Sequence, residues 1–273
     1  FETTDMDGDI TEAFNKVDND WNFLFTGHWL QGKVGEDRKD ISMLIKVFCE
    51  TFKNKKNSPG LILKTSSATF SVLDREDMLK KIKSVTKTVK GDLPKIHLLD
   101  GELTDNQMNQ LYNHPKVKAH VSFTHGEGFG RPLLEACQSG KPVIASGWSG
   151  QVDFLHKNYA VLLGGSLGKV PKGSFPKEML FDESQWFTVN YQQASQVLMD
   201  VFNNYNKYLI KSKQLQMYTK GSFSFDKMKD KLEGIITKIL SDVPKQVGIK
   251  LPKLKKTNSN KIPEVKLPKL KKA

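Results

Sequence analysis

Short apolar segments with strand character alternate with helix-like segments along most of the chain. Residues 22–26 form one apolar run that Gly27 closes, and the apolar residues within 40–52 then recur at the spacing of one helix face. Repeated units of this kind with short turns predict an α/β fold, a doubly wound parallel sheet covered by helices on both faces. Such Rossmann-like sheets bind ligands at the carboxyl ends of their strands, near the point where the strand order reverses. The expected strands are 22–26, 60–64, 95–99, 119–123, 142–145 and 159–163, and the expected helices are 40–52, 74–89, 104–112, one that ends at Gly140, 191–206 and 224–240.

This pattern assigns residues 21–240 to one domain. Residues 1–20 are acidic and weakly periodic, so we expect a leader or an inter-domain linker there. The first residues lack the pattern of a secretory signal, and no apolar run approaches the roughly 18 residues of a membrane span. Cys49 and Cys137 stand in helix-like apolar patterns, which favours buried thiols in a reducing compartment and therefore a cytoplasmic location.

The net charge of +12 is concentrated at the end of the chain. Residues 241–273 hold ten Lys against Asp242 and Glu264, so the rest of the chain carries only +4 and is not obviously a polyanion binder. The segment Lys250–Lys256, Lys-Leu-Pro-Lys-Leu-Lys-Lys, recurs as Lys266–Lys272. Proline and like charge oppose helix and core formation, which predicts an extended tail. The alternative is a docking segment for an acidic surface on a partner.

A glycine-rich turn follows the fourth expected strand and precedes a helix. Gly126, Gly128 and Gly130 allow the backbone to bend sharply and approach a ligand closely. The free N–H groups and positive dipole at the start of the next helix suit a phosphate or a sugar hydroxyl. The same sequence also occurs where a strand simply turns into a helix, so the turn alone does not establish a site.

Two glutamates flank this turn. Glu127 lies in the loop, and Glu135 lies about two helical turns into the helix, among apolar neighbours. A carboxylate without a partner in such surroundings is costly, so Glu135 needs one. Ribose hydroxyls are good donors to a carboxylate, and the alternative partner is a Lys or Arg at the edge of the core.

The segment Glu127-Gly-Phe-Gly-Arg-Pro-Leu-Leu-Glu135, with Gly140-Lys-Pro-Val-Ile-Ala145 and Ser149-Gly150 after it, resembles the signature of retaining GT-B glycosyltransferases of the group 1 type. The resemblance runs from about Asn22 to about Leu240, and details such as Gly27-His-Trp29 look like a branch found in large bacteriophages. It implies that this chain is the C-terminal, donor-binding half of a GT-B fold.

The resemblance also implies roles for single residues. Glu127 would act in catalysis, facing the hydroxyls of the donor sugar, and Glu135 would bind the ribose of the nucleotide. The backbone of the turn, at Gly126, Gly128, Phe129 and Gly130, would lie against sugar and phosphate.

Cations are expected at the diphosphate, because bond breaking leaves extra negative charge on this leaving group. Family members usually place an Arg after the first Gly, here Gly27, but this chain has His28 at that position. Lys39 matches the second family cation, and Arg38 beside it would replace the lost charge. Lys64, at the end of the second expected strand, is a further candidate, although a solvated strand end explains it equally well.

Other residues are open to two interpretations. His125 suits either a sugar contact or a structural hydrogen bond, and Trp148 and Trp186 either wall a pocket or pack in the core. No Asp-x-Asp cluster follows a strand, so we expect neither a metal nor a cofactor other than the nucleotide sugar itself.

These features together predict a hexosyltransferase-like enzyme that binds a nucleotide-diphosphate sugar. With an acceptor domain, which is missing from this chain or supplied by another subunit, it would transfer the sugar with retention. Alone, the chain should bind nucleotide but transfer sugar poorly. The alternative is a non-catalytic module that binds a nucleotide sugar or serves as a scaffold through its basic tail.

Overall fold

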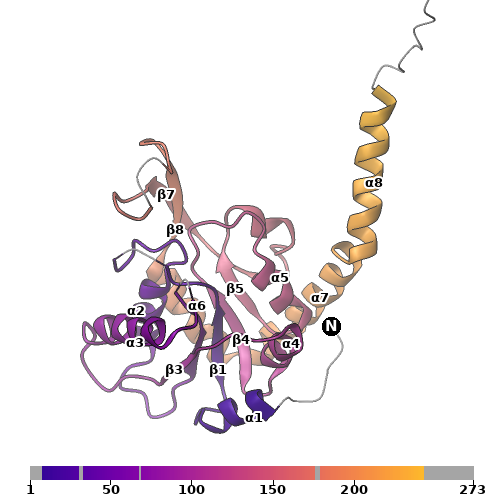
Figure 1. Ribbon diagram of the computed structural model, residues 1–273. Helices are drawn as coiled ribbons and strands as arrows, with labels where there is room; N and C mark the ends of the chain where they lie inside the picture. Colours follow the sequence, from indigo (N-terminus) through magenta and orange to yellow (C-terminus); the bar gives the residue numbers. More distant parts are fainter. Residues whose placement is uncertain (1–7, 31–32, 68, 176–178, 243–273) are drawn as a thin grey trace, which may run out of the picture. The chain divides into compact units, whose positions relative to one another are not determined.

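The computed structural model describes residues 8–30, 33–67, 69–175 and 179–242, and the chain divides into two units, residues 1–228 and 229–273 (Figure 1). The first unit is built on a parallel sheet with the strand order β3-β2-β1-β4-β5-β6. Its order reverses between β1 and β4, so the predicted doubly wound, Rossmann-like α/β fold is confirmed. The strands are β1 (Asn22–Thr26), β2 (Gly60–Lys64), β3 (Ile96–Leu99), β4 (Val117–Ser122), β5 (Val143–Ser146) and β6 (Val161–Leu163).

Helices cover both faces of this sheet. Alternate residues of a strand point to opposite faces, and β1 shows the result: Phe23 and Phe25 belong to one hydrophobic core, whereas Leu24 belongs to the other. Figure 1 shows α2 and α3 on one side of the sheet and α4 and α5 on the other. The helices of this unit are α1 (Gly8–Asn15), α2 (Ile41–Phe52), α3 (Val72–Thr86), α4 (Asp105–Asn113), α5 (Arg131–Gln138), α6 (Tyr191–Asn203) and α7 (Tyr205–Ser222), with a short 3₁₀ turn at Gly150–Asp153.

Local sequence explains where two of these helices begin. α4 starts with a capping box, in which Thr104 Oγ1 accepts from the Gln107 backbone and Gln107 Oε1 accepts from the Thr104 backbone. α3 begins earlier than the expected Asp74, because the Ser71 hydroxyl accepts from the Asp74 N–H and makes Ser71 the N-cap. The expected helix at 104–112 therefore agrees closely, and the one at 74–89 is shifted towards its N-terminus.

Four elements, in addition to the 3₁₀ turn, were not expected. Residues 8–15 form α1 within the segment taken as a leader or linker, and Ile10, Phe14 and Val17 are buried in the core. The segment after β6 forms an antiparallel hairpin of β7 (Gly165–Lys169) and β8 (Gln185–Val189). α7 follows α6 almost without a break. In α1 the buried positions have helical spacing, whereas the two glycines of β7 hide its strand character.

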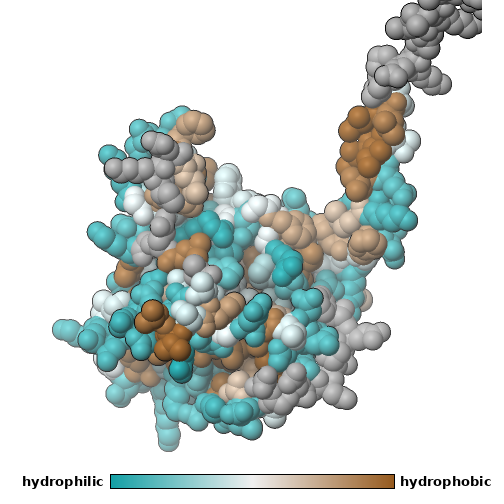
Figure 2. Space-filling view, in the orientation of Figure 1, coloured by the Kyte–Doolittle hydropathy of each residue, from teal (hydrophilic) through white to brown (hydrophobic). Residues whose placement is uncertain are grey.

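The last helix, α8 (Phe225–Asp242), enters the second unit at Lys229. Leu232, Ile235, Ile236 and Ile239 recur along one face and are all more than 40 % exposed, visible as brown on α8 in Figure 2. None of the helices described is long and apolar enough to cross a membrane. The repeated Lys-Leu-Pro-Lys-Leu-Lys-Lys segments lie outside the described residues.

Candidate functional site

The loops after β1 and β4 meet at the carboxyl edge of the sheet, where the strand order reverses. The β1–α2 loop carries Arg38 and Lys39, and the β4–α5 loop carries Glu127. The two loops are joined by a backbone hydrogen bond, in which the His125 N–H donates to the Arg38 carbonyl over 3.0 Å. The topology therefore brings together candidate residues that are almost ninety positions apart in the sequence.

The β4–α5 loop has the sharp turn that its glycines predict. Gly130 has φ 88° at the N-cap of α5, a left-handed conformation that favours glycine, and Pro132 follows within the first helical turn. Gly150 packs against the backbone of this loop and donates its N–H to the Glu127 carbonyl. A Cβ added at Gly150 would lie 2.1 Å from the Gly128 carbonyl oxygen, so only glycine fits there.

The Glu127 carboxylate is held by three side chains. Lys39 Nζ lies 2.5 Å and Thr124 Oγ1 2.8 Å from Oε1, and Arg38 Nη1 lies 3.4 Å from Oε2. Lys39 and Glu127 are largely buried, with side chains 12 % and 10 % exposed, whereas the Arg38 side chain is 45 % exposed. The structure therefore joins the three residues expected to act in catalysis into one cluster.

This ion pair determines the charge state of the cluster. Burial alone would raise the pKa of Glu127, but Lys39, with help from Thr124 and Arg38, outweighs burial and lowers it. Burial is the main cause of a lowered pKa at Lys39, and Glu127 opposes it. Glu127 is accordingly an ionised hydrogen-bond acceptor at neutral pH, suited to the hydroxyls of a sugar.

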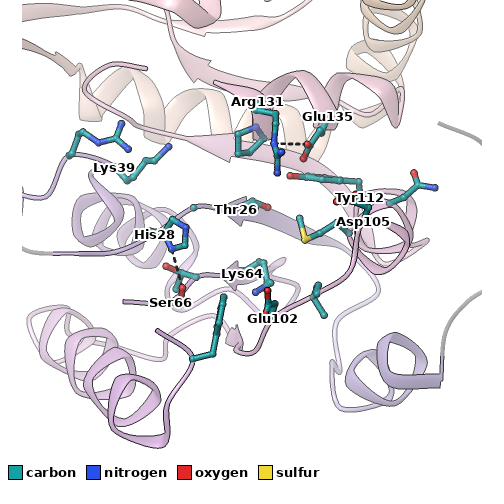
Figure 3. Close-up of a pocket in the computed structure, with 18 residues that line it drawn as sticks. Thr26, His28, Lys39, Lys64, Ser66, Glu102, Asp105, Tyr112, Arg131 and Glu135 are labelled. Carbon is teal, nitrogen blue, oxygen red and sulfur yellow. Dashed lines mark hydrogen bonds and ion pairs between the residues drawn. The ribbon is translucent and has the colours of Figure 1, made fainter. Parts of the chain in front are cut away.

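A cavity of about 630 Å³ opens beside this cluster, a size typical of small-molecule sites. Figure 3 shows Lys39 and His28 towards one end and Tyr112, Asp105 and Glu135 towards the other. The lining holds four basic side chains and three carboxylates, in addition to neutral polar and apolar groups. The basic and acidic lining residues are Arg38, Lys39, Lys64, Arg131, Glu102, Asp105 and Glu135.

Lys64 and His28 both line this cavity, along with Gly27. Lys64 is 8 % exposed, donates to the Gly101 carbonyl and lies 5.0 Å from the centre of the Phe70 ring, so it is not a solvated strand end. Burial lowers its pKa, and the carboxylates of Asp100 and Glu102 oppose this shift. His28 Nδ1 lies 3.1 Å from Ser66 Oγ, which orients the ring that replaces the usual family Arg.

Glu135 lies at the other end of the cavity. Its partner is Arg131, one helical turn away, with Nε 3.1 Å from Oε1. Burial raises the pKa of Glu135 despite this neighbour. Tyr112 lines the same end with its hydroxyl buried, and Thr26 Oγ1 is buried close by. The expected alternative, an arginine as the partner of Glu135, is therefore observed, and the Glu135 side chain also lines the cavity.

The loop glycines and Phe129 do not line this cavity. The Gly126 carbonyl accepts from Arg38 Nη1, Gly130 is the N-cap of α5, and the centre of the Phe129 ring lies 5.2 Å from that of Phe154. His125 is buried and hydrogen-bonded to Phe187, and Trp186 stacks on it at 3.8 Å, so both belong to the structural framework.

Several lining residues were missed from the sequence. Thr26, Thr65 and Ser66 directly follow the buried parts of β1 and β2, so their position at the carboxyl edge of the sheet was the available signal. Tyr112 gives no such signal, because it reads as an ordinary apolar position of α4. No group of three His, Cys, Asp or Glu side chains in the described ranges is placed to hold a metal.

The lining suits a ligand with an anionic part and a hydroxyl-rich part. Arg38 and Lys39 offer donors to phosphate oxygens, and charge-assisted hydrogen bonds of this kind are strong. Glu135 offers acceptors to hydroxyl groups. Because Lys39 and Glu135 lie towards opposite ends of one cavity, a nucleoside diphosphate could place both parts at once.

Comparison with known proteins agrees with this geometry. The family model described as Glycosyl transferases group 1 matches residues 33–164, which include both loops of the site. None of the curated proteins matches the chain.

Solved structures share the fold at low sequence identity. The C-terminal domain of the group 1 glycosyl transferase LpcC from Francisella tularensis is 14 % identical with a TM-score of 0.53, covering 80 % of this chain and 95 % of that domain. Anabaena HepE in complex with UDP and glucose is 13 % identical with a TM-score of 0.56, covering 86 % of this chain and 54 % of that one. Sucrose-phosphate synthase from Thermosynechococcus elongatus is 13 % identical with a TM-score of 0.57, covering 85 % of this chain and 49 % of that one.

This chain thus spans about half the length of HepE and of the synthase, and nearly all of the isolated LpcC domain. The match to the family model over residues 33–164 and the shared sheet agree: the chain resembles the glycosyl transferases group 1 family over those residues, and it has the fold of the C-terminal half of a GT-B glycosyltransferase.

Proposed function

We propose that this chain is the donor-binding half of a glycosyltransferase that uses a nucleotide-diphosphate sugar. The observation that carries the proposal is the 630 Å³ cavity, with Lys39 towards one end and Glu135 towards the other, and with Arg38 contacting the same Glu127 carboxylate as Lys39. The diphosphate would lie against the two cations, and the ribose would donate to Glu135. The sugar would extend past Lys39 to the Glu127 carboxylate.

Chemistry at this site depends on charge. Breaking the bond between sugar and phosphate leaves extra negative charge on the leaving diphosphate, and fixed cations stabilise that charge in the transition state. Lys39, half of a largely buried pair with Glu127, is held in place before the ligand arrives. We propose that no metal is needed, and that transfer with retention requires an acceptor domain to complete the cleft.

The finer assignments are part of the same proposal. A hexose as the sugar, a place in a bacteriophage-like branch and a cytoplasmic location follow from the sequence resemblance and the two buried thiols, Cys49 and Cys137. A partner with an acidic surface for the tail, residues 241–273, follows from its charge alone.

A second candidate, a non-catalytic nucleotide-sugar module, has one observation in its favour. Glu127 is already engaged by Lys39 and Arg38, so its carboxylate is paired without a ligand. Both candidates predict nucleotide binding, and they differ in what Glu127 does.

A thermal-shift panel of UDP-, GDP-, ADP- and dTDP-sugars tests the binding step. A ligand at about 100 times its dissociation constant should add roughly 2.7 kcal/mol of stability. Wild-type protein should respond to one of the four, and chelation with EDTA should leave the response unchanged. A panel with no response would overturn the proposed function.

Glu127→Gln separates the two candidates. The amide removes the charge that engages Lys39, so the nucleoside diphosphate alone should bind at least as tightly as to wild type. Sugar transfer, measured with an acceptor domain supplied, should fall by about a hundredfold or more. Transfer that survives unchanged would rule out the catalytic role of Glu127. Glu76→Gln, at an exposed position of α3 outside the cavity lining, is the matched control and should leave transfer close to wild type.

A further inference from the structure

Asp40 and His125 lie where three segments of the chain meet, directly behind the Lys39–Glu127 pair. Asp40 ends the β1–α2 loop, and His125 belongs to the β4–α5 loop. The third segment supplies Phe187 from β8, whose N–H donates to the His125 carbonyl over 3.2 Å, and Tyr191 at the start of α6. Residues that carry the proposed chemistry are thus next to this junction along both loops.

The junction contains two buried polar atoms that face each other. Asp40 is 0 % and His125 2 % exposed, and His125 Nε2 lies 3.9 Å from Asp40 Oδ1. Neither atom has a hydrogen-bond partner among the described residues, and the 3.9 Å between them is longer than a hydrogen bond. The other ends of both side chains are fixed, because the Tyr191 hydroxyl donates to Asp40 Oδ2 over 2.7 Å and His125 Nδ1 lies 2.7 Å from the Phe187 carbonyl oxygen.

These contacts determine where hydrogens stand. A carbonyl oxygen only accepts, so His125 Nδ1 must carry a hydrogen, and in a neutral ring Nε2 is then a bare acceptor. An ionised Asp40 would set a second acceptor against it. Asp40 Oδ1 and His125 Nε2 attract each other only if one of the two atoms carries a proton.

Burial favours the arrangement in which neither residue is charged. It raises the pKa of Asp40 to about 8, against the opposing effect of the Tyr191 hydrogen bond, and Asp37 raises it further. Burial also lowers the pKa of His125. The nearby cations, Lys39 and Arg38, do not pair with Asp40, because both contact the Glu127 carboxylate. The neighbouring carboxylate of Asp37 accepts hydrogen bonds from the first turn of α2.

We propose that Asp40 is a positioning residue whose neutral carboxyl directs its proton at His125 Nε2 and so holds the loops that carry Lys39 and Glu127 in register. The arrangement of Asp40 and His125 does not depend on the proposed function. Its consequence for donor binding rests on the proposed function.

The backbone at Asp40 makes a clean test possible. Its φ of 52° is in the left-handed region, which asparagine tolerates better than most residues. In Asp40→Asn we expect the side-chain amide to present a donor to His125 Nε2 while its carbonyl oxygen accepts from Tyr191, whatever the pH. Asp40→Ala keeps neither contact.

Unfolding of the two variants and wild type is compared between pH 4.5 and 8.5. The folded-state pKa of Asp40 is raised above its unfolded value of about 3.9, so its stabilising contribution is complete below that pH and is lost as the pH rises through about 8. Asp40→Asn should therefore melt close to wild type at pH 4.5 and roughly 5 °C or more above it at pH 8.5. Asp40→Ala should melt below Asp40→Asn at both pH values.

Two results would overturn the proposal. If Asp40 were an anion paired with a protonated His125, Asp40→Asn would melt below wild type at acid and neutral pH. If Asp40→Ala matched Asp40→Asn throughout, the side chain would hold nothing in place.

Binding of UDP-glucose between pH 7 and 9 provides the second readout. Wild-type affinity should fall by about tenfold more than that of Asp40→Asn over this range. Any titration of Lys39 affects both proteins equally and cancels in the comparison. Equal pH profiles would show that the junction does not position the site. If UDP-glucose binds to neither protein at any pH, the proposed effect of Asp40 on donor binding is wrong. The melting data then still test whether Asp40 holds the two loops together.

Discussion

Replacing Lys39 with alanine is expected to lower the rate of sugar transfer by about 10²–10³-fold and the affinity for a nucleoside diphosphate by about 10–100-fold. Lys39 lines the cavity, is the cation nearer to the Glu127 carboxylate, and has a side chain that is only 12 % exposed. Charge held in such a water-poor position acts more strongly than the same charge on the surface. Calorimetry with UDP measures the affinity, and transfer is measured with an acceptor domain supplied.

Arg38→Ala should have a smaller effect than Lys39→Ala. Its side chain is 45 % exposed, and its ion-pair distance to Glu127 is 3.4 Å rather than 2.5 Å. The exposed Lys80, on α3, provides the matched control, and Lys80→Ala should bind UDP as wild type does.

One confounding effect has to be separated. Lys39→Ala leaves the Glu127 carboxylate largely buried without its nearest cation, which destabilises the loop by itself. The double variant with Glu127→Gln removes that carboxylate charge. It should recover most of the melting temperature but not the affinity for UDP. If affinity returned with stability, Lys39 would support the loop and not the ligand.

The parallel sheet could be predicted because its strands are short, apolar and bounded by turn residues, whereas its strand order came from the structure. All five residues of β2 are buried, as a strand covered on both faces requires. The hairpin was missed because Gly165–Lys169 has no alternation of apolar and polar residues. α1 was missed because its overall acidity hid the helical spacing of Ile10, Phe14 and Val17.

The site was predictable where chemistry follows the turn of a strand into a helix. Lys64 ends β2, Glu127 lies in the loop after β4, and Lys39 directly precedes the N-cap of α2; the structure brings them to one edge of the sheet. Asp40 and His125 belong to loops that are far apart in the sequence, so no local sequence pattern predicts that they lie close together. The role of Tyr112 in the cavity was missed for a related reason. A tyrosine that packs in the core and one that lines a cavity give the same helical spacing in the sequence.

Gly150→Ala is expected to destabilise the protein by about 1–3 kcal/mol and to abolish most donor binding. The added Cβ would lie 2.1 Å from the Gly128 carbonyl oxygen and 2.8 Å from that of Glu127. Both neighbours are backbone atoms, so relief requires the β4–α5 loop to move away, and the hydrogen bond from Gly150 N–H to the Glu127 carbonyl is then strained. Urea unfolding and UDP titration measure the two effects.

Gly128→Ala, in the same loop, is the matched control for stability. A Cβ there would meet nothing within 4 Å, so its unfolding free energy should stay within about 0.5 kcal/mol of wild type. If Gly150→Ala were equally stable, the close approach of the two backbones would be unnecessary. If Gly150→Ala lost binding but not stability, the displaced loop would have carried Glu127 away from Lys39. The ligand site would then depend on the close packing of Gly150 against the Gly128 carbonyl more than the fold does.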